Sequence, residues 1–178
     1  MNDPVPGKTI PSTRFMKIIT AIFFACCFSF AGAQTVPNFD LIKLEKASDY
    51  KIAEPFVLQT ATYLLSTPYK KDNKDRTSSL QFIGKWMYGT TDYSFVFNDV
   101  GERIGKDNNE LIGLYMTAMV KYTLENKAAA KDPKQVKLNA LILLLNYCEN
   151  KENNMRMSKQ LKKLSEAKEK GQLDQTVL

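Results

Sequence analysis

Histidine is absent from all 178 residues of the chain. Its absence excludes every mechanism in which an imidazole acts as general base, proton shuttle or metal ligand. Asn-x-Ser/Thr is also absent, so the sequence offers no acceptor for N-linked glycosylation. No motif for catalysis, metal binding or nucleotide binding is complete. The sequence therefore predicts no catalytic residue, no metal and no cofactor.

Two stretches contain parts of known ligand motifs. Gly101–Lys106 has three residues between its glycines, whereas a phosphate loop has four, with Ser or Thr after the lysine. Asp107–Glu110 are not followed by the glycine and glutamate that a calcium loop needs at its sixth and twelfth positions. The first stretch is expected to be a turn, and the second the start of a helix.

Cysteine is scarce, since the chain has only Cys26, Cys27 and Cys148. The first two lie in an N-terminal apolar segment that is predicted to be removed. Cys148 would then remain alone, which excludes a disulfide framework within one chain. Because Cys148 follows three leucines at helical spacing, a buried and unreactive thiol is expected.

Residues 1–33 have the features of an export signal. Basic residues precede an uncharged apolar run at 18–30, which is shorter than the roughly 20 residues of a membrane-spanning helix. The small residues Ala31-Gly32-Ala33 predict cleavage after Ala33 and a mature chain that begins at Gln34. The predicted location is the periplasm or the outside of the cell, with no stable membrane span after cleavage.

Two alternatives would keep the chain at a membrane. An uncleaved segment would act as an N-terminal anchor, and a lipid on Cys26 or Cys27 would have the same effect. Residues 1–15 contain three prolines and a glycine, unlike the start of a typical signal. Met16 is therefore an alternative start of the chain.

Residues 34–178 predict a single all-α domain. Five or six helices of 10–20 residues with short connections indicate a compact antiparallel helical bundle or an irregular stack of helix pairs. The absence of a 34-residue period argues against a tetratricopeptide-like solenoid. Residues 34–48 are expected to form an N-terminal arm.

The first two helices are expected on either side of a charged loop. Apolar residues recur at intervals of three and four from Asp49, with Pro55 suited to the first turn and Pro68 ending the segment. The second helix is expected to begin at a cap on Thr77 or Ser78 and to end at Gly89.

Residues 90–106 are ambiguous, because aromatic residues alternate there as in a strand while aliphatic residues recur as in a helix. No partner strand is evident elsewhere. A short helix broken by Gly101 and Gly105 is therefore expected.

Two strongly apolar helices are predicted at Asn109–Asn126 and Lys134–Glu149. Each has too few polar residues to expose a full face, so each is expected to be covered on more than one side. Asp132 and Pro133 are suited to the cap and the first turn of the second helix.

A basic helix at 155–170 is expected to close one side of the domain, with an apolar stripe at Met157, Leu161, Leu164 and Ala167. Residues 34–178 have 22 basic and 18 acidic residues, and residues 151–170 have seven basic and three acidic. The whole positive excess therefore lies in this segment. Lysines on such a helix commonly only solvate it. The functional alternative is contact with an anionic surface through Arg156, Lys159, Lys162, Lys163 and Lys170.

The sequence favours an exported, non-enzymatic domain that binds a partner or serves the cell envelope. The partner would be an envelope protein or an anionic surface, and nucleic acid is not expected. The alternative is a ligand or lipid carrier, or a small hydrolase, with an aromatic pocket at Tyr69, Trp86, Tyr88 and Tyr93. A filled core at Trp86 would favour the first, and a deep cavity with convergent polar groups the second.

Overall fold

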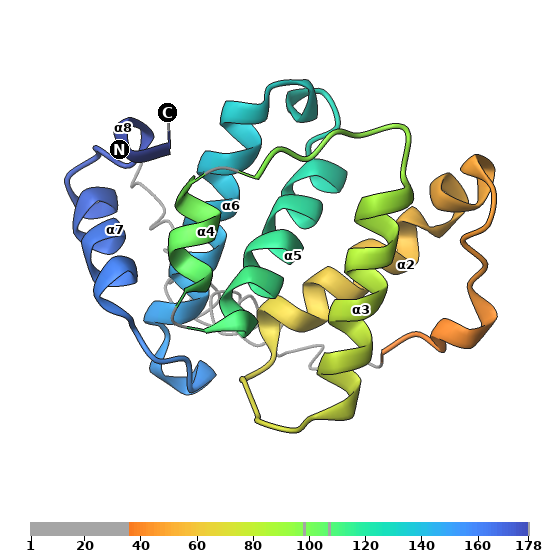
Figure 1. Ribbon diagram of the computed structural model, residues 1–178, viewed down its shortest axis with the longest axis horizontal. Helices are drawn as coiled ribbons and strands as arrows, with labels where there is room; N and C mark the ends of the chain where they lie inside the picture. Colours follow the sequence, from red (N-terminus) through yellow and green to blue (C-terminus); the bar gives the residue numbers. More distant parts are fainter. Residues whose placement is uncertain (1–35, 98, 107, 178) are drawn as a thin grey trace, which may run out of the picture. The chain divides into compact units, whose positions relative to one another are not determined.

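The computed structural model describes residues 36–97, 99–106 and 108–177, which form an all-α domain (Figure 1). The longer helices are α2 (Ala47–Ser66), α3 (Lys74–Gly89), α5 (Asn109–Glu125), α6 (Pro133–Glu149) and α7 (Lys159–Glu169). The shorter elements are α4 (Asp99–Gly105), α8 (Asp174–Val177) and the 3-10 turns η1 (Phe39–Leu41), η2 (Ala129–Lys131) and η3 (Lys151–Asn153). The described residues contain no strand, so the all-α prediction is confirmed.

Helix α5 lies at the centre of the packing. It contacts α2, α3, α4 and α6, and Figure 1 shows it between α3 and the pair formed by α4 and α6. Nine of its 17 residues are buried. Helix α6 contacts α2, α5, α7 and α8. Both helices are covered on more than one side, as their apolar sequences predict.

Helix α2 begins before the expected residue, and Pro55 lies in its interior and not in its first turn. The carboxylate of Asp49 accepts the backbone N–H groups of Glu45 and Lys46, at 3.1 and 3.0 Å, and so starts the helix at Ala47. These hydrogen bonds lower the pKa of Asp49. Pro55 is exposed and leaves one helical hydrogen bond unmade, while burial of the opposite face stabilises the helix.

The expected cap of α3 at Thr77 or Ser78 is also wrong. Asn73 is the cap, and its side chain accepts the N–H of Arg76 at 3.1 Å. The charged residues at 74–76 therefore belong to the helix and not to a loop. Gly89 ends α3 as predicted, and a β-carbon there would lie 2.1 Å from the hydroxyl oxygen of Tyr50.

Residues 90–106 divide into two parts. Residues 90–97 are extended without strand pairing, and α4 follows. A short helix is thus present, but Gly101 does not break it. This glycine lies inside α4, where a β-carbon would approach the ring of Tyr115 to 3.3 Å. Gly105 is the last residue of the helix.

The boundaries of α5 and α6 agree with the sequence to within one residue, and Asp132 and Pro133 occupy the expected cap and first-turn positions. Helix α7 begins at Lys159, four residues later than expected, because Ser158 caps it and residues 154–158 are not helical. None of the described helices is both long enough and apolar enough to span a membrane. The predicted signal segment lies outside the described residues.

Cys148 is buried as predicted, and burial raises the pKa of its thiol to about 12. Tyr115 is also buried, and its hydroxyl has no hydrogen-bond partner among the described residues. Burial raises the pKa of this phenol to about 12. Both groups are held in their neutral forms, because the interior disfavours the anion.

Tyr115→Phe is expected to raise the free energy of unfolding by about 1 kcal/mol at pH 7, because it removes a buried hydroxyl without a partner. Above pH 10 the unfolded phenol loses its proton while the folded one keeps it, so stability falls as pH rises toward 12. The variant should lose less stability than the parent over this range. Urea unfolding at pH 7, 10 and 11 measures both effects. A loss of stability at pH 7 would show that the hydroxyl has a partner, and Tyr88→Phe on the surface is the control.

Candidate functional site: an apolar groove beside the N-terminal arm

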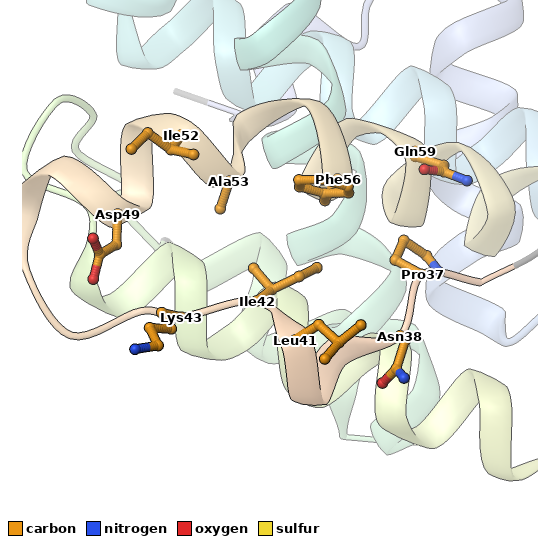
Figure 2. Close-up of a pocket in the computed structure, with 10 residues that line it drawn as sticks. All are labelled: Pro37, Asn38, Leu41, Ile42, Lys43, Asp49, Ile52, Ala53, Phe56 and Gln59. Atoms are coloured by element: carbon orange, nitrogen blue, oxygen red, sulfur yellow. The ribbon is translucent and has the colours of Figure 1, made fainter.

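Residues 36–46, here called the arm, run alongside α2 in the opposite direction (Figure 2). Figure 2 shows Pro37 near Gln59 at one end and Lys43 near Asp49 at the other. A groove of about 460 Å3 lies between the arm and the helix. Its lining residues are Pro37, Asn38, Leu41, Ile42, Lys43, Asp49, Ile52, Ala53, Phe56 and Gln59.

The arm is held in place by a small number of contacts. The ring of Phe39 stacks on Phe82 of α3, with centroids 4.6 Å apart. Leu44 is buried, and its carbonyl oxygen accepts a hydrogen bond from the hydroxyl of Tyr50 at 3.3 Å. These contacts fix one wall of the groove against α3 as well as against α2.

Exposed apolar side chains are concentrated in this groove. Leu41, Ile52 and Phe56 are 79%, 69% and 43% exposed, and all three line it. A neighbouring hollow of about 510 Å3 shares Ile52 and adds Pro55, so the apolar surface continues along α2. An apolar surface of this kind on a folded domain commonly marks a binding site.

The polar groups of the groove lie at its two ends. The carboxylate of Asp49 is occupied by the backbone N–H groups at the start of α2. The side-chain oxygen of Asn38 accepts the N–H of Asp40 at 3.2 Å and caps η1. The ten lining residues provide neither a nucleophile with a base nor a pair of free carboxylates. The arrangement is suited to recognition of an apolar surface.

The structure separates the residues of the predicted aromatic pocket. Trp86 is fully buried, and its Nε1–H donates to the carbonyl of Tyr50 at 2.8 Å. Tyr93 lies beside it, with ring centroids 5.9 Å apart. Tyr88 is 97% exposed, because two residues along a helix point to nearly opposite sides. Tyr69 lies against Arg76, and Arg76 is ten residues before Trp86 on α3. The structure therefore brings Tyr93 and Trp86 together, while Tyr88 and Tyr69 lie elsewhere.

Polar groups near Trp86 pair with one another. The hydroxyl of Tyr93 donates to Glu54 at 3.2 Å, and Lys127 binds the other carboxylate oxygen at 2.5 Å. Burial and the nearby carboxylate raise the pKa of Tyr93, and the hydrogen bond to Glu54 raises the pKa of Lys127. With both oxygens of Glu54 occupied, this cluster ties the extended segment at 90–97 to α2.

The five basic residues predicted to contact an anionic surface are all exposed. Arg156, Lys159 and Lys162 line a common hollow, whereas Lys163 and Lys170 do not. Lys168, on the same helix, pairs with Glu149 at 2.5 Å. The contact itself stays a prediction.

Asn108–Glu110, which belong to the stretch compared with a calcium loop, lie at the start of α5 as expected. Asn108 caps α5 by accepting the N–H of Glu110 at 2.9 Å, and Glu110 pairs with Arg76. The described residues contain no group of three side chains that could hold a metal ion. Asp107 lies outside them.

Sequence reasoning missed the groove, although α2 carried a signal for it. Ile52 and Phe56 are four residues apart on one side of the helix, beside the buried stripe of Ala53 and Val57. A second apolar stripe next to the first indicates a helix with more apolar surface than its own core contacts require.

Comparison with known proteins finds no relationship: no protein-family model, curated protein or solved structure matches this chain.

Proposed function

We propose that this chain is an exported helical interaction domain that binds an apolar segment of a partner protein in the groove between its arm and α2. The observation that carries the proposal is that Leu41, Ile52 and Phe56 are exposed together in this groove. Export rests on the signal features of residues 1–33, and it places the partner in the cell envelope or outside the cell.

The form of the groove favours a polypeptide over a small molecule. Pockets for small ligands enclose most of the ligand surface, whereas Ile52 and Leu41 remain largely open to solvent. A partner helix with one apolar face would cover these side chains and keep its polar face in water. Polar groups at the two ends of the groove resemble the polar rim of a protein interface.

The surroundings of Trp86 support the same choice. A carrier or hydrolase at this residue would need a cavity with convergent polar groups, but Trp86 is fully buried. The neighbouring polar groups of Glu54, Tyr93 and Lys127 are paired with one another. We therefore favour an interaction domain over a carrier or hydrolase with a pocket at Trp86.

Replacing Ile52 and Phe56 with serine is expected to weaken partner binding by about tenfold or more, because each apolar side chain contributes on the order of 1 kcal/mol when a partner covers it. The fold should persist, since both side chains are exposed. Photo-crosslinking from position 52 or 56 in the native envelope identifies the partner, and the dissociation constant is then measured with purified partner.

Tyr88→Ser is the matched control, because it removes an exposed large side chain that does not line the groove. It should bind as the parent does. Equal losses for the control and the double variant would contradict the proposal. Saturable binding of a fatty acid at positions 52 and 56, with no crosslinked protein, would assign the groove to a lipid carrier.

A further inference from the structure

The hollow that Arg156, Lys159 and Lys162 share has a volume of about 610 Å3 and lies between the start of α5 and the start of α7. Its lining residues are Asn108, Leu111, Arg156, Met157, Ser158, Lys159 and Lys162. Three of these seven residues are cationic, and none is acidic. Met157 is half-buried and leaves part of an apolar side chain next to the charges, whereas Leu111 is almost completely buried.

The three cations of this hollow make no ion pair with any residue that the structure describes. The ion pairs of the described residues join Arg76 to Glu110, Lys121 to Glu125, Lys127 to Glu54 and Lys168 to Glu149. The two ends of α7 therefore differ. Lys168 near its end ties the helix to α6, whereas the basic residues at its start have no ion-pair partner among the described residues.

The backbone that carries these cations is anchored on both sides. Before Arg156, the side chain of Asn153 donates to the carbonyl of Tyr147 at 2.9 Å, and Met155 is buried. After it, the Ser158 hydroxyl oxygen accepts the N–H of Leu161 at 3.2 Å. The side-chain amide of Asn108 contacts the sulfur of Met155 at 3.6 Å and joins the two walls. A backbone that is already fixed loses less conformational freedom when a ligand binds.

We propose that this hollow binds a phosphate group carried by an organic ligand. A guanidinium can bind two phosphate oxygens at once, and the two ammonium groups supply further charge-assisted hydrogen bonds. Met157 would contact the apolar part of the ligand next to the phosphate. A phospholipid headgroup and a soluble phosphate ester share this chemistry.

Two triple variants of the full-length chain separate a defined site from a general attraction to positive charge. The first replaces the lining residues Arg156, Lys159 and Lys162 with glutamine. The second replaces Lys151, Lys163 and Lys170, which are exposed in the same segment but do not line the hollow. Both remove three positive charges. Because all six side chains are exposed, both variants should keep the circular dichroism and melting temperature of the parent.

Calorimetry with hexyl phosphate, with inorganic phosphate, and with sodium chloride at matched ionic strength measures the binding. The parent should bind hexyl phosphate more tightly than inorganic phosphate, and the lining variant should bind it about tenfold or more weakly. The control variant should change by less than about threefold, since exposed charges outside the site are screened. No binding by the parent, or equal losses for the two variants, would overturn the proposal.

Vesicles of phosphatidylglycerol, compared with phosphatidylcholine, identify the source of the phosphate. Loss of vesicle binding in the lining variant alone would support a lipid headgroup. Binding of hexyl phosphate without vesicle binding would support a soluble ester. No residue lines both this hollow and the groove beside the arm, so either proposal can fail while the other stands.

Discussion

Arg76→Ala is expected to lower the free energy of unfolding by about 3–5 kcal/mol, because it leaves a partly buried carboxylate without its partner. Arg76 is 2% exposed, and its Nε and Nη2 atoms donate to one oxygen of Glu110 at 3.0 and 2.7 Å. Its Nη1 donates to the carbonyls of Leu64 and Thr67 at 3.3 and 3.2 Å. One side chain thus joins the end of α2 to the starts of α3 and α5. Urea unfolding measures the loss.

A second variant tests the cause of this loss. Arg76→Met combined with Glu110→Leu removes both charges and should be more stable than Arg76→Ala, because no charge is then left unpaired. A loss below about 1 kcal/mol in Arg76→Ala would instead match an exposed ion pair and would contradict the role assigned to this residue.

Trp86→Ala is expected to destabilise the fold by about 3–5 kcal/mol, because it opens a large cavity between α3 and the extended segment. The side chain is fully buried. The centroid of its ring lies 5.9 Å from that of Tyr93 and 6.3 Å from that of Phe95. The carbonyl of Tyr50 would also lose its donor. Unfolding followed by far-ultraviolet circular dichroism measures the change, since the variant retains no tryptophan.

Two further variants separate packing from hydrogen bonding at this position. Trp86→Phe should lose less than Trp86→Ala, because it keeps most of the packing and gives up the hydrogen bond. Tyr88→Ala, two residues along, should change stability by less than about 0.5 kcal/mol, since that side chain is in solvent. Similar losses at positions 86 and 88 would be incompatible with the burial described.

Local sequence signals were sufficient to predict the two helices at the centre of the fold. Helices α5 and α6 each combine a long apolar run with a capping residue directly before it, Asn108 and Asp132. Each capping residue lies directly before the helix that it caps, so it can be recognised without knowledge of the fold. The all-α class and the boundaries of both helices could therefore be predicted from the sequence.

Non-local contacts explain where the sequence was insufficient. The charged residues before Thr77 read as a loop because the partner of Arg76 lies 34 residues away, on α5. The spacing of Trp86 and Tyr88 already separates them around α3, but the positions of Tyr69 and Tyr93 depend on contacts with Arg76 and Glu54 that the sequence does not reveal. The groove depends on the position of the arm, which the stacking of Phe39 on Phe82 and the burial of Leu44 hold in place. Such contacts join residues that are far apart in the chain, so no local sequence pattern predicts them.

The central position of α5 determines where related sequences can diverge. Its buried residues pack against α2, α3, α4 and α6, so a change at one of them must be accommodated by neighbouring helices. Even alanine at Gly113 would bring a β-carbon to 2.9 Å from the side chain of Leu80. Helix α7 has only two buried residues, Leu161 and Leu164, and can drift more freely. Homologues that kept Arg156, Lys159 and Lys162 while the rest of α7 changed would therefore show selection for a ligand and not for the fold.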